Sequence, residues 1–430
     1  MNREYKDSGI SWVGQIPANW KIIRNKNAFS CRKGIIGRHS SNTQLLSLTT
    51  KGIKAINQGE TSGKVPESYD SYQIVDENNI VMCLFDLDCS AVFAGISNYK
   101  GMISPAYKVL TCKQCILPQY ADYWFAYVFY DRKFMHYSKN IRYSLTYEEF
   151  SSLSILLPSL TEQKKIVDFL DSKCKEIDGL IDLQERMIQS LTEYKQSVIT
   201  EAVTCGLNPN VKYVSSGIEW LQKIPENWNV VRIKSIFKRR SEKNDPVKTI
   251  ERLSLSIDKG VTLYSEKTTN LDRFKEDFTQ YQLAYPNDIV LNSMNMIVGA
   301  VGLSRYKGCV SPVYYVIYSN KGVNMEYYSF LLNCQPIRDI YHSYGKGIYA
   351  IERGEGRVNT CRLKVSYDDF GSILVPMPNI DEQEAIADYI HTKSKEIDNL
   401  IAMKLQKIES LKEYKKSMIF EAVTGKIEMA

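Results

Sequence analysis

The sequence lacks the features of membrane-spanning proteins and of disulfide-linked secreted proteins. No apolar run reaches the roughly 18 residues that a membrane-spanning helix needs. The first residues, MNREYKD, are polar and contain no apolar stretch typical of a signal peptide. The ten cysteines are scattered along the 430 residues, which favours reduced thiols over a disulfide framework. We therefore expect a soluble, cytoplasmic protein that buries ordinary hydrophobic cores.

The motifs of DNA-modifying and ATP-driven enzymes are missing as well. A DNA-amino methyltransferase needs an Asn/Asp-Pro-Pro-aromatic loop that holds the flipped base, and the sequence contains no Pro-Pro pair. It also contains no Gly-x(4)-Gly-Lys-Ser/Thr phosphate loop. His136, His342 and His391 have no companions at the spacing of a metal site or a catalytic triad. The sequence thus predicts no catalytic residue, no metal site and no bound cofactor in this chain.

Two short patterns are incomplete versions of known sites. Cys112-x-x-Cys115 supplies half of a zinc site, but the sequence lacks a second ligand pair at a matching spacing. Gly345-x-Gly347-x-x-Ala350 is similar to a phosphate-binding turn, but no clear buried strand precedes it and no acidic partner follows at the expected distance. We interpret the second pattern as a mobile surface loop.

The modest net charge of +6 is unevenly distributed along the chain. The formal charge is +5 over residues 1–160, −3 over 161–204, +6 over 205–380 and −2 over 381–424. Two basic blocks therefore alternate with two acidic ones. A basic surplus on two separate blocks favours a polyanion that is bound at two places, with ordinary surface variation as the alternative.

Three collinear matches indicate that the chain is an internal duplication. The matching segments are 8–24 with 216–232, 95–105 with 302–312, and 157–206 with 377–426. The first pair is identical at nine of 17 positions, and the third at 24 of 50 positions without a gap. Each half of the chain thus consists of a globular block followed by a similar long segment.

The globular blocks combine short β-type runs with shorter helical stretches. The predicted strands lie at 80–84, 107–110, 289–291 and 313–318, and the predicted helices at 120–134 and 325–333. We expect two α+β domains, small mixed sheets with helices, over residues 1–158 and 206–378. Four of the five tryptophans fall in the repeated N-terminal segments, and we interpret them as core residues: Trp12, Trp20, Trp220 and Trp228.

The long segments are predicted to be helices over 159–205 and 379–425, followed by a short tail, 426–430. They begin at the capping boxes Ser159-x-x-Glu162 and Asn379-x-x-Glu382, and Gly206 and Gly425 end them. Apolar residues recur at alternating steps of three and four, which is the pattern of a helix-pairing seam. The seam residues are Leu170, Ile177, Ile181, Ile188, Leu191 and Val198 in the first helix, and Ile390, Ile397, Ile401, Ile408, Leu411 and Met418 in the second.

Each long helix has a suitable partner in the other one. The first helix carries the chain from block one to block two and the second must return, so the pair is expected to be an antiparallel coiled coil that separates the two blocks. A helix over 161–204 is about 66 Å long at 1.5 Å per residue. The predicted architecture has approximate two-fold symmetry.

The order of domain, long helix, domain and long helix resembles the specificity subunit of type I restriction–modification enzymes. The likeness covers nearly the whole chain and rests on a few segments. These are SGI-x-W-x(3)-IP-x-NW, YKG-x(2)-SP, Asn292-x-Met294-Asn295-Met296 with Gly299-Ala300, and the helix starts Leu157-Pro158…Glu162-Gln163-Lys164 and Met377-Pro378…Glu382-Gln383-Glu384, which are similar to the family's LP-x(2)-EQ.

The resemblance implies a DNA-binding subunit without catalytic activity. Each globular block is then a target-recognition domain that reads one half of a bipartite, asymmetric site on double-stranded DNA. The long helices act as spacer and as docking surface for two methyltransferase subunits, and a restriction and motor subunit joins that core. S-adenosylmethionine, ATP and magnesium are expected on those partners.

Candidate DNA contacts are the basic and amide residues of the turns and loops in each block. They are Arg32, Lys33, Arg38, His39, Lys100 and Arg142 in block one, and Lys238, Arg239, Arg240, Asn292, Asn295, Arg305, Lys307, Lys346, Arg353 and Arg357 in block two. Solvated charge clusters and a simple β-turn at YKG are the structural alternatives. Block one departs from block two, because residues 83–87 read CLFDL where 292–296 read NSMNM.

Two other functions remain open at this point. The chain is alternatively a repeat scaffold that binds only proteins, or a part of a fused restriction–methylation enzyme. Salt-dependent DNA binding distinguishes the first alternative, and cofactor binding by the isolated chain distinguishes the second.

Overall fold

The computed structural model of the 430-residue chain divides into two compact units. It describes residues 3–32, 34–50, 52–57, 66–88, 93–130, 132–138, 143–266, 277–348, 352–353, 357–358 and 362–429. Unit 1 is built mainly from residues 1–185 and 405–430, and unit 2 from 186–353 and 357–404. Each unit therefore contains one globular block and one part of each long helix.

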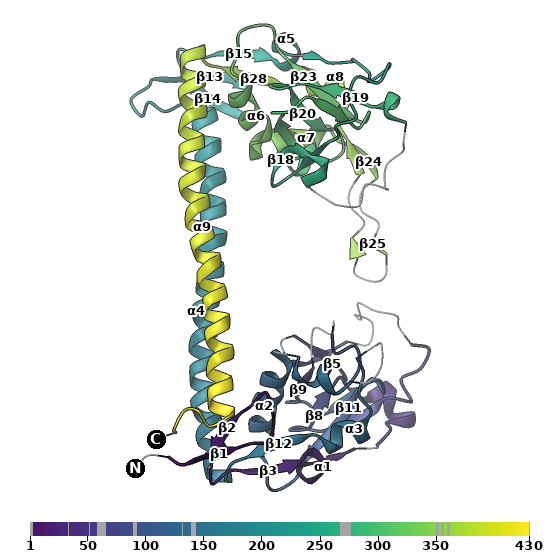
Figure 1. Cartoon of the computed structure of the whole chain (residues 1–430). Coiled ribbons are helices and arrows are strands. Elements are labelled where there is room, and N and C mark those ends of the chain that lie inside the picture. Colours follow the sequence, from purple (N-terminus) through teal and green to yellow (C-terminus); the bar gives the residue numbers. More distant parts are fainter. Residues whose placement is uncertain are drawn as a thin grey trace. The chain divides into compact units, whose positions relative to one another are not determined.

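The two long helices are confirmed. Helix α4 spans Leu160–Cys205 and helix α9 spans Ile380–Val423. In unit 1 the first part of α4 lies beside the last part of α9 with opposite chain direction, and unit 2 contains the remaining parts of both (Figure 1). None of the helices in the described part of the chain is long and apolar enough to cross a membrane.

The predicted seam lies between these helices. All twelve side chains assigned to it are buried or half-buried, and Ile177 and Ile397, which are equivalent in the repeat, are each 4% exposed. Two equivalent ion pairs flank the seam. In unit 1, Lys415 Nζ lies 2.7 Å from the Asp178 carboxylate, and in unit 2, Lys195 Nζ lies 2.7 Å from that of Asp398. The helix pairing thus repeats with the sequence.

Each long helix begins with only half of the predicted capping box. The Glu162 amide donates to Ser159 Oγ at 3.2 Å, and the Glu382 amide donates to Asn379 Oδ1 at 2.9 Å. The glutamate side chains do not turn back as predicted, because other groups hold them. Arg3 donates to the Glu162 carboxylate, and Asn227 donates to that of Glu382 at 3.2 Å.

The helices end at two glycines that no other residue replaces easily. Gly206 has φ +75° and Gly425 has φ +73°, which is the left-handed conformation expected after a helix C-terminus. A Cβ at Gly206 would lie 3.2 Å from Cζ2 of Trp228, and one at Gly425 would lie 2.4 Å from Cδ of Pro17. The repeated SGI…IP-x-NW segment therefore packs directly against the helix ends.

The globular block of unit 1 holds two four-stranded sheets and two strand pairs. Its sheets have the orders β6-β5-β10-β7 and β4-β11-β8-β9, and its pairs are β1-β2 and β12-β3. The strands are β1 Tyr5–Asp7, β2 Gln15–Pro17, β3 Lys21–Arg24, β4 Phe29–Cys31, β5 Leu45–Thr49, β6 Gly52–Ile56, β7 Gln73–Val75, β8 Ile80–Met82, β9 Ala94–Ile96, β10 Gly101–Ile103, β11 Lys108–Cys112 and β12 Ser154–Leu157. The helices are α1 Asn25–Ala28, η1 Gly37–Asn42, α2 Pro118–Tyr130, η2 Lys133–Tyr137 and α3 Tyr147–Ser152.

Unit 2 repeats this arrangement around the four-stranded sheet β16-β23-β20-β21. Its strands are β13 Tyr213–Ile218, β14 Leu221–Pro225, β15 Asn229–Arg232, β16 Lys238–Arg239, β17 Leu253–Ser256, β18 Gly260–Leu263, β19 Gln282–Ala284, β20 Ile289–Asn292, β21 Val301–Leu303, β22 Gly308–Val310, β23 Tyr314–Tyr318, β24 Lys346–Ile348, β25 Glu352–Arg353, β26 Arg357–Val358, β27 Arg362–Lys364 and β28 Leu374–Met377. The helices are α5 Ile233–Ile236, η3 Tyr264–Glu266, η4 Phe278–Gln280, η5 Met296–Val298, α6 Met325–Asn333, α7 Gln335–Tyr344 and α8 Tyr367–Ser372.

The predicted secondary structure of the blocks is confirmed at five of its six segments. The exception is the helix predicted over 120–134. There α2 ends at Tyr130, and a separate 3₁₀ helix begins at Lys133. Arg132 between them has φ +53°, a left-handed conformation that an α-helix does not contain.

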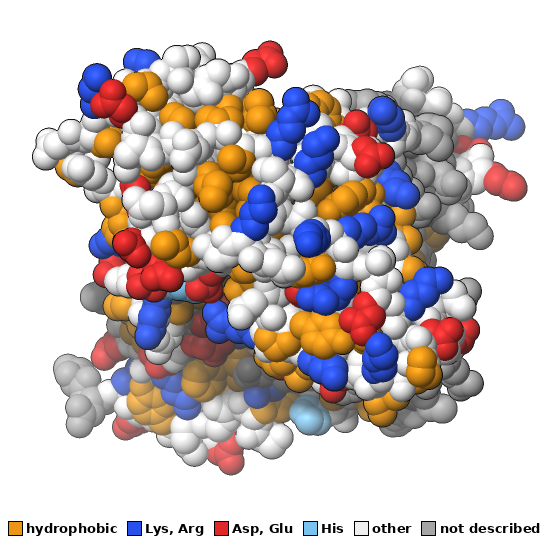
Figure 2. All heavy atoms as spheres, turned by 90° about the horizontal axis from the view of Figure 1, so that it is seen from above, with side chains coloured by type: hydrophobic (Ala, Val, Ile, Leu, Met, Phe, Trp, Pro, Cys, Tyr) orange, Lys and Arg blue, Asp and Glu red, His pale blue; other side chains and the backbone are white. Residues whose placement is uncertain are grey.

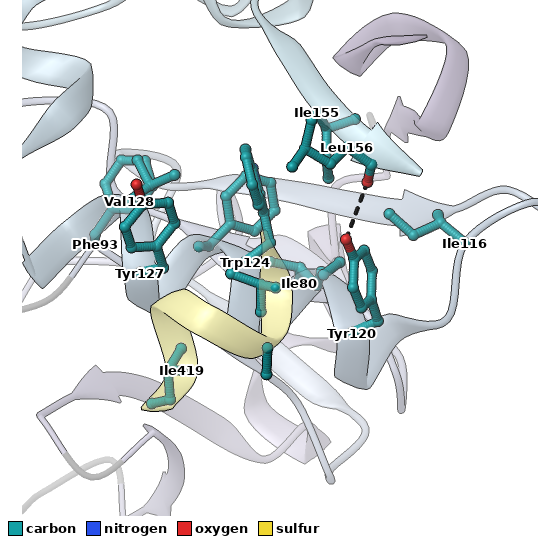
Figure 3. Packing of buried hydrophobic residues seen from close by; sticks show 14 of the residues in the cluster. Ile80, Phe93, Ile116, Tyr120, Trp124, Tyr127, Val128, Ile155, Leu156 and Ile419 are labelled. Carbon is teal, nitrogen blue, oxygen red and sulfur yellow. Dashed lines mark hydrogen bonds between the residues drawn. The ribbon is translucent and has the colours of Figure 1, made fainter. Parts of the chain in front are cut away.

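The core of unit 1 joins the globular block to the helices. Trp20 and Trp124 are each at most 1% exposed, and Ile419 of α9 belongs to the same cluster (Figure 3). Tyr120 of α2 donates its hydroxyl to the carbonyl of Leu156 at 3.2 Å. Trp12, Trp220 and Trp228 likewise pack in or against the core of their own unit, so the four repeated tryptophans are core residues as predicted.

We predict that a charge in the seam unfolds the helix pairing. Ile177→Asp or Ile397→Asp buries a carboxylate without a partner cation, which costs about 3 kcal/mol or more. The midpoint of urea unfolding, followed by helical circular dichroism, should fall clearly for both variants. Ser172→Asp is the matched control, because Ser172 is exposed on the same helix and should leave the midpoint unchanged. Unchanged midpoints for the isoleucine variants would contradict the pairing.

Candidate nucleic-acid interface

The repeated G-x-S-x-YKG-x(2)-SP segment forms the same fixed turn in both units. In unit 1, Ser97 Oγ accepts from the Tyr99 amide at 3.2 Å and donates to the Tyr99 carbonyl at 2.8 Å. In unit 2, Ser304 Oγ makes the same two hydrogen bonds with Tyr306, at 3.3 and 2.8 Å. The turn places the exposed side chains of Lys100 and Lys307 at its tip.

The glycine of YKG is required by a close approach of two strands. A Cβ at Gly101 would lie 2.4 Å from the carbonyl oxygen of Gln44, and one at Gly308 would lie 2.7 Å from Cγ of Leu253. The motif is therefore first a structural element that holds β10 or β22 against its neighbour. Its lysine is the part that remains available to a ligand.

A repeated glutamine, which the sequence analysis missed, fixes the other end of this segment. Gln73 Nε2 donates to the carbonyls of Ser104 and Tyr107 at 3.2 and 2.7 Å. Gln282 Nε2 donates to the carbonyls of Pro312 and Tyr314 at 3.0 and 2.9 Å. Both glutamines lie in a weak fourth repeat, in which YQIVDENNIV of residues 72–81 matches YQLAYPNDIV of residues 281–290. This repeat is the sequence signal that could have identified them.

Arg240, one of the predicted DNA contacts, is engaged within unit 2. Its Nε and Nη2 donate to the two carboxylate oxygens of Asp288 at 2.7 and 2.8 Å, and the Asp288 side chain is 3% exposed. The guanidinium also lies 4.7 Å from the ring centre of Tyr285 and 4.4 Å from that of Tyr318. The hydrogen bond to Asp288 raises the pKa of Arg240 above its usual value.

Arg32 occupies the equivalent position in unit 1 and is also paired. Its guanidinium donates to the carboxylate of Asp76, in the loop before β8. In both units, the arginine that follows the edge strand, β4 or β16, is thus paired with an aspartate. That aspartate lies in the loop before β8 in unit 1 and before β20 in unit 2. This pairing supports a structural role for Arg32 and Arg240 beside the predicted DNA contact.

Arg239 differs from its neighbour. Its side chain is exposed, and its guanidinium carbon lies 5.0 Å from the ring centre of Tyr315 and 5.4 Å from that of Tyr367. Burial raises the pKa of Tyr315, and the positive charge of Arg239 opposes part of this rise. These tyrosines were not predicted, since their distance in sequence from Arg239 gives no signal.

Exposed cations are concentrated on the segment of β15, α5 and β16. They are Arg232, Lys234, Lys238 and Arg239. Figure 2 views the molecule from above, the side on which Figure 1 places α5 and β15, and it shows Lys and Arg side chains gathered over part of this face among hydrophobic ones. In unit 1, the exposed Arg24 and Lys26 hold the positions equivalent to Arg232 and Lys234, which the prediction omitted.

The two predicted amide residues of unit 2 lie at the end of β20 and in the turn that follows it. Asn292 Oδ1 accepts from the amide of Met294 at 3.1 Å, so this side chain helps to shape the turn. The side chain of Asn295 is exposed. The corresponding CLFDL segment of unit 1 forms another turn, in which Asp86 has φ +50°. The two turns therefore present different chemical groups.

The remaining predicted contacts are spread over each unit. Arg38 and His39 are on η1 and are exposed. Arg305 Nη2 lies 3.7 Å from Glu326 Oε1, and Lys346 Nζ lies 3.6 Å from Asp369 Oδ2. In both ion pairs the basic side chain is exposed. Lys33 and Arg142 lie outside the described residues, and Arg353 and Arg357 are placed only as backbone of β25 and β26.

The described residues contain no group of three or more His, Cys, Asp or Glu side chains that would hold a metal ion. Burial, together with the nearby Cys115, raises the pKa of the Cys112 thiol to about 12. Burial thus disfavours the thiolate form of Cys112.

Comparisons with known proteins agree with this arrangement. Residues 19–193 match the family model described as the type I restriction modification DNA specificity domain. The type I restriction enzyme MjaVIII specificity subunit of Methanocaldococcus jannaschii is 23% identical over 381 residues, which are 83% of this chain and 80% of the relative. Over most of its length the chain is thus similar to specificity subunits of type I restriction–modification systems.

Two further comparisons extend the likeness. The putative MjaX specificity subunit of the same organism is 28% identical over 292 residues, which are 66% of this chain and 62% of the relative. A solved structure from a study of complex assembly and conformational transition of the type I R-M system matches 96% of this chain and 99% of its own, with a TM-score of 0.66 and 12% identity. The latter match supports the fold of the specificity subunit.

The structure gives a physical reason for the LP-x(2)-EQ segment of this chain. Gln163 is fully buried; its Oε1 accepts from the Leu117 amide at 2.8 Å, and its Nε2 donates to the carbonyls of Cys115 and Pro158, both at 3.0 Å. Gln383 repeats this, accepting from the Asn324 amide at 2.9 Å. The glutamine thus joins each long helix to the loop before α2 or α6.

We predict that the neighbouring arginines Arg239 and Arg240 differ in their effect on stability. Arg240→Ala leaves the buried Asp288 carboxylate without its cation and should lower the free energy of unfolding by roughly 3 kcal/mol. Arg239→Ala removes only the ring contacts of an exposed side chain and should lower the free energy of unfolding by less than about 1 kcal/mol. Urea unfolding of both variants measures the difference. Equal losses would show that the Arg240–Asp288 pair does not hold the sheet.

Proposed function

We propose that each unit of this specificity subunit reads one half of a bipartite, asymmetric site on double-stranded DNA. The observation that carries the proposal is a repeated scaffold that presents different groups. The YKG turns, the buried glutamines and the helix ends are equivalent in the two units. The NSMNM and CLFDL turns are not equivalent, because the first exposes Asn295 whereas the second offers only the half-buried Phe85 and Asp86. The two half-sites therefore differ in sequence.

The chain acts without catalytic chemistry of its own. The missing methyltransferase and ATPase motifs support this part of the proposal. S-adenosylmethionine, ATP and magnesium are then bound by the methyltransferase and restriction subunits. Phosphate contacts from the exposed lysines and arginines supply affinity, and base contacts supply sequence selectivity.

Exposed apolar residues on the long helices support docking of two identical partners. Leu180 and Leu183 of α4 are 41% and 43% exposed, and both belong to unit 1. Their equivalents in unit 2, Leu400 and Met403 of α9, are 45% and 64% exposed. Residues three apart share a helix face, so each unit presents the same apolar pair. One methyltransferase subunit on each pair accounts for the repetition.

The first test exchanges one reading domain. Replacing residues 206–376 by the corresponding block of a related specificity subunit should change one half of the methylated motif and preserve the other, because each unit reads independently. The motif is determined by methylome sequencing of cells that carry the complete system. A chimera that assembles normally but alters both half-sites would contradict the proposal, and so would a wild-type motif that is not split.

The second test concerns the docking surfaces. Leu180→Asp with Leu183→Asp should abolish one methyltransferase site, and Leu400→Asp with Met403→Asp should abolish the other. Native mass spectrometry should then find one methyltransferase subunit per chain instead of two. Leu405→Asp is the control, since Leu405 is exposed and its equivalent in α4 is already an acidic residue, Glu185. Two bound subunits in either double variant would exclude this docking surface.

A further inference from the structure

The two adjacent arginines of unit 2 have opposite surroundings. Two N–H groups of the Arg240 guanidinium, at Nε and Nη2, donate in parallel to Asp288, and the guanidinium also contacts the rings of Tyr285 and Tyr318. Among the described residues, Arg239 lies over two rings, those of Tyr315 and Tyr367. Within the described part of the chain, no carboxylate forms an ion pair with Arg239. Its parallel N–H groups therefore remain available to a ligand.

The tyrosines restrict where the Arg239 guanidinium can go. Arg239 is opposite Ile317 in the antiparallel pair of β16 and β23, so its side chain is on the sheet face that also carries Tyr315. Tyr315 is 6% exposed, and its hydroxyl donates to the carbonyl of Val365 at 2.9 Å. Tyr367, on α8, lies 5.4 Å from Tyr315, ring centre to ring centre. The rings of Tyr315 and Tyr367 thus restrict the position of the Arg239 side chain, although that side chain is exposed.

Parallel guanidinium donors bind phosphates as well as base edges, but the fixed position of this group favours a base, whose acceptors have to be met at one place. The two N–H groups match the O6 and N7 acceptors of guanine in the major groove, and this is the commonest base-specific contact in protein–DNA complexes. A phosphate contact needs only a mobile cation, and the exposed Lys238 next to Arg239 supplies one. Ordering the guanidinium before binding also lowers the entropy cost of reading a base.

We propose that Arg239 recognises a guanine in the half-site read by unit 2, and that Tyr315 and Tyr367 are its positioning residues. The proposal rests on the proposed function, because it assigns one base to one of the two reading units. It adds a residue, a base and a geometry to that function.

Unit 1 lacks this arrangement. Strand register places Cys31 at the position of Arg239 and Lys108 at that of Tyr315. Only the second ring is retained, since Tyr147 is equivalent to Tyr367 in the repeat. The half-site read by unit 1 therefore has no guanine read in this way, and the difference is one physical source of the asymmetry of the whole site.

The first experiment compares methylated motifs. The complete system is expressed with wild-type chain, with Arg239→Ala and with Arg239→Lys, and the methylomes are sequenced. We expect one guanine to become degenerate in the half-site of unit 2 in both variants, while the other half-site stays unchanged. The domain exchange of residues 206–376 identifies which half-site belongs to unit 2. A wild-type half-site without guanine on either strand would overturn the proposal.

The second experiment measures binding of the methyltransferase complex to duplexes in which 7-deazaguanine replaces that guanine. This base lacks the N7 acceptor. Wild-type complex should lose affinity for the modified duplex, and Arg239→Ala should bind both duplexes equally. On the unmodified site, Arg239→Ala should bind about 5- to 150-fold more weakly than wild type, the range of one bidentate base contact.

Lys238→Ala is the matched control for a phosphate contact. It should weaken binding to all duplexes by a similar factor and reduce the slope of log affinity against log salt concentration by about one. If Arg239→Ala behaves in the same way, with an unchanged motif, Arg239 contacts the backbone and the proposal is wrong. An unaltered affinity and motif would overturn it as well.

The positioning role has its own test. Tyr367→Phe keeps the ring beneath Arg239 and should preserve both affinity and motif. Tyr367→Leu removes the ring and should weaken discrimination between guanine and 7-deazaguanine, with the melting temperature recorded to detect any loss of folding. Equal discrimination by both variants would exclude Tyr367 as a positioning residue. A split wild-type motif with these negative results would leave the proposed function intact and remove only this inference.

Discussion

The apolar seam of the long helices is the constraint on which the structure depends. A helix of 46 residues with a stripe of isoleucine and leucine along one side cannot bury that stripe by itself. The partner for each part of α4 is a part of α9 from the far end of the sequence. Unit 1 is thus completed only when the last part of α9 has been made, because it needs residues 405–430.

The globular blocks are attached to this helix pair by a small set of repeated contacts. A buried glutamine binds the loop before α2 or α6, a tryptophan packs against a left-handed glycine at the helix end, and a tyrosine hydroxyl is bonded to the strand before each helix. Tyr120 and Tyr328 make this last bond to the carbonyls of Leu156 and Pro376. The glutamine amides and the tyrosine hydroxyls are buried together with their hydrogen-bond partners, which fixes the orientation of each block on its own helices.

Selectivity is separated from this attachment. The conserved scaffold of the duplication uses side chains that are buried or bonded to backbone, whereas the groups that differ between the units are on turns and on the open edge of the sheet. Arg239 and Arg240 illustrate the division within two residues. One is bonded to a buried carboxylate and holds the sheet, and the other is exposed above two rings. A duplicated fold can in this way read two different sequences without a change in its core.

The sequence by itself determined the duplication, the two long helices and their seam, because periodicity and internal identity are local or directly visible in the letters. It also indicated the family, since several short segments occur in the right order. It did not determine how the polar residues are used. Glu162 and Glu382 were expected to cap their own helices, yet Arg3 and Asn227 bind them.

Only the tertiary structure decided which cations are free. Asp288 lies 48 residues from Arg240, and Tyr367 is still farther from Arg239, so no spacing rule in the sequence connects them. Side-chain partners depend on strand register and on how helices cover the sheet, and these follow from packing of the whole unit. Local pattern therefore specifies the elements, and the contacts between distant elements specify the site.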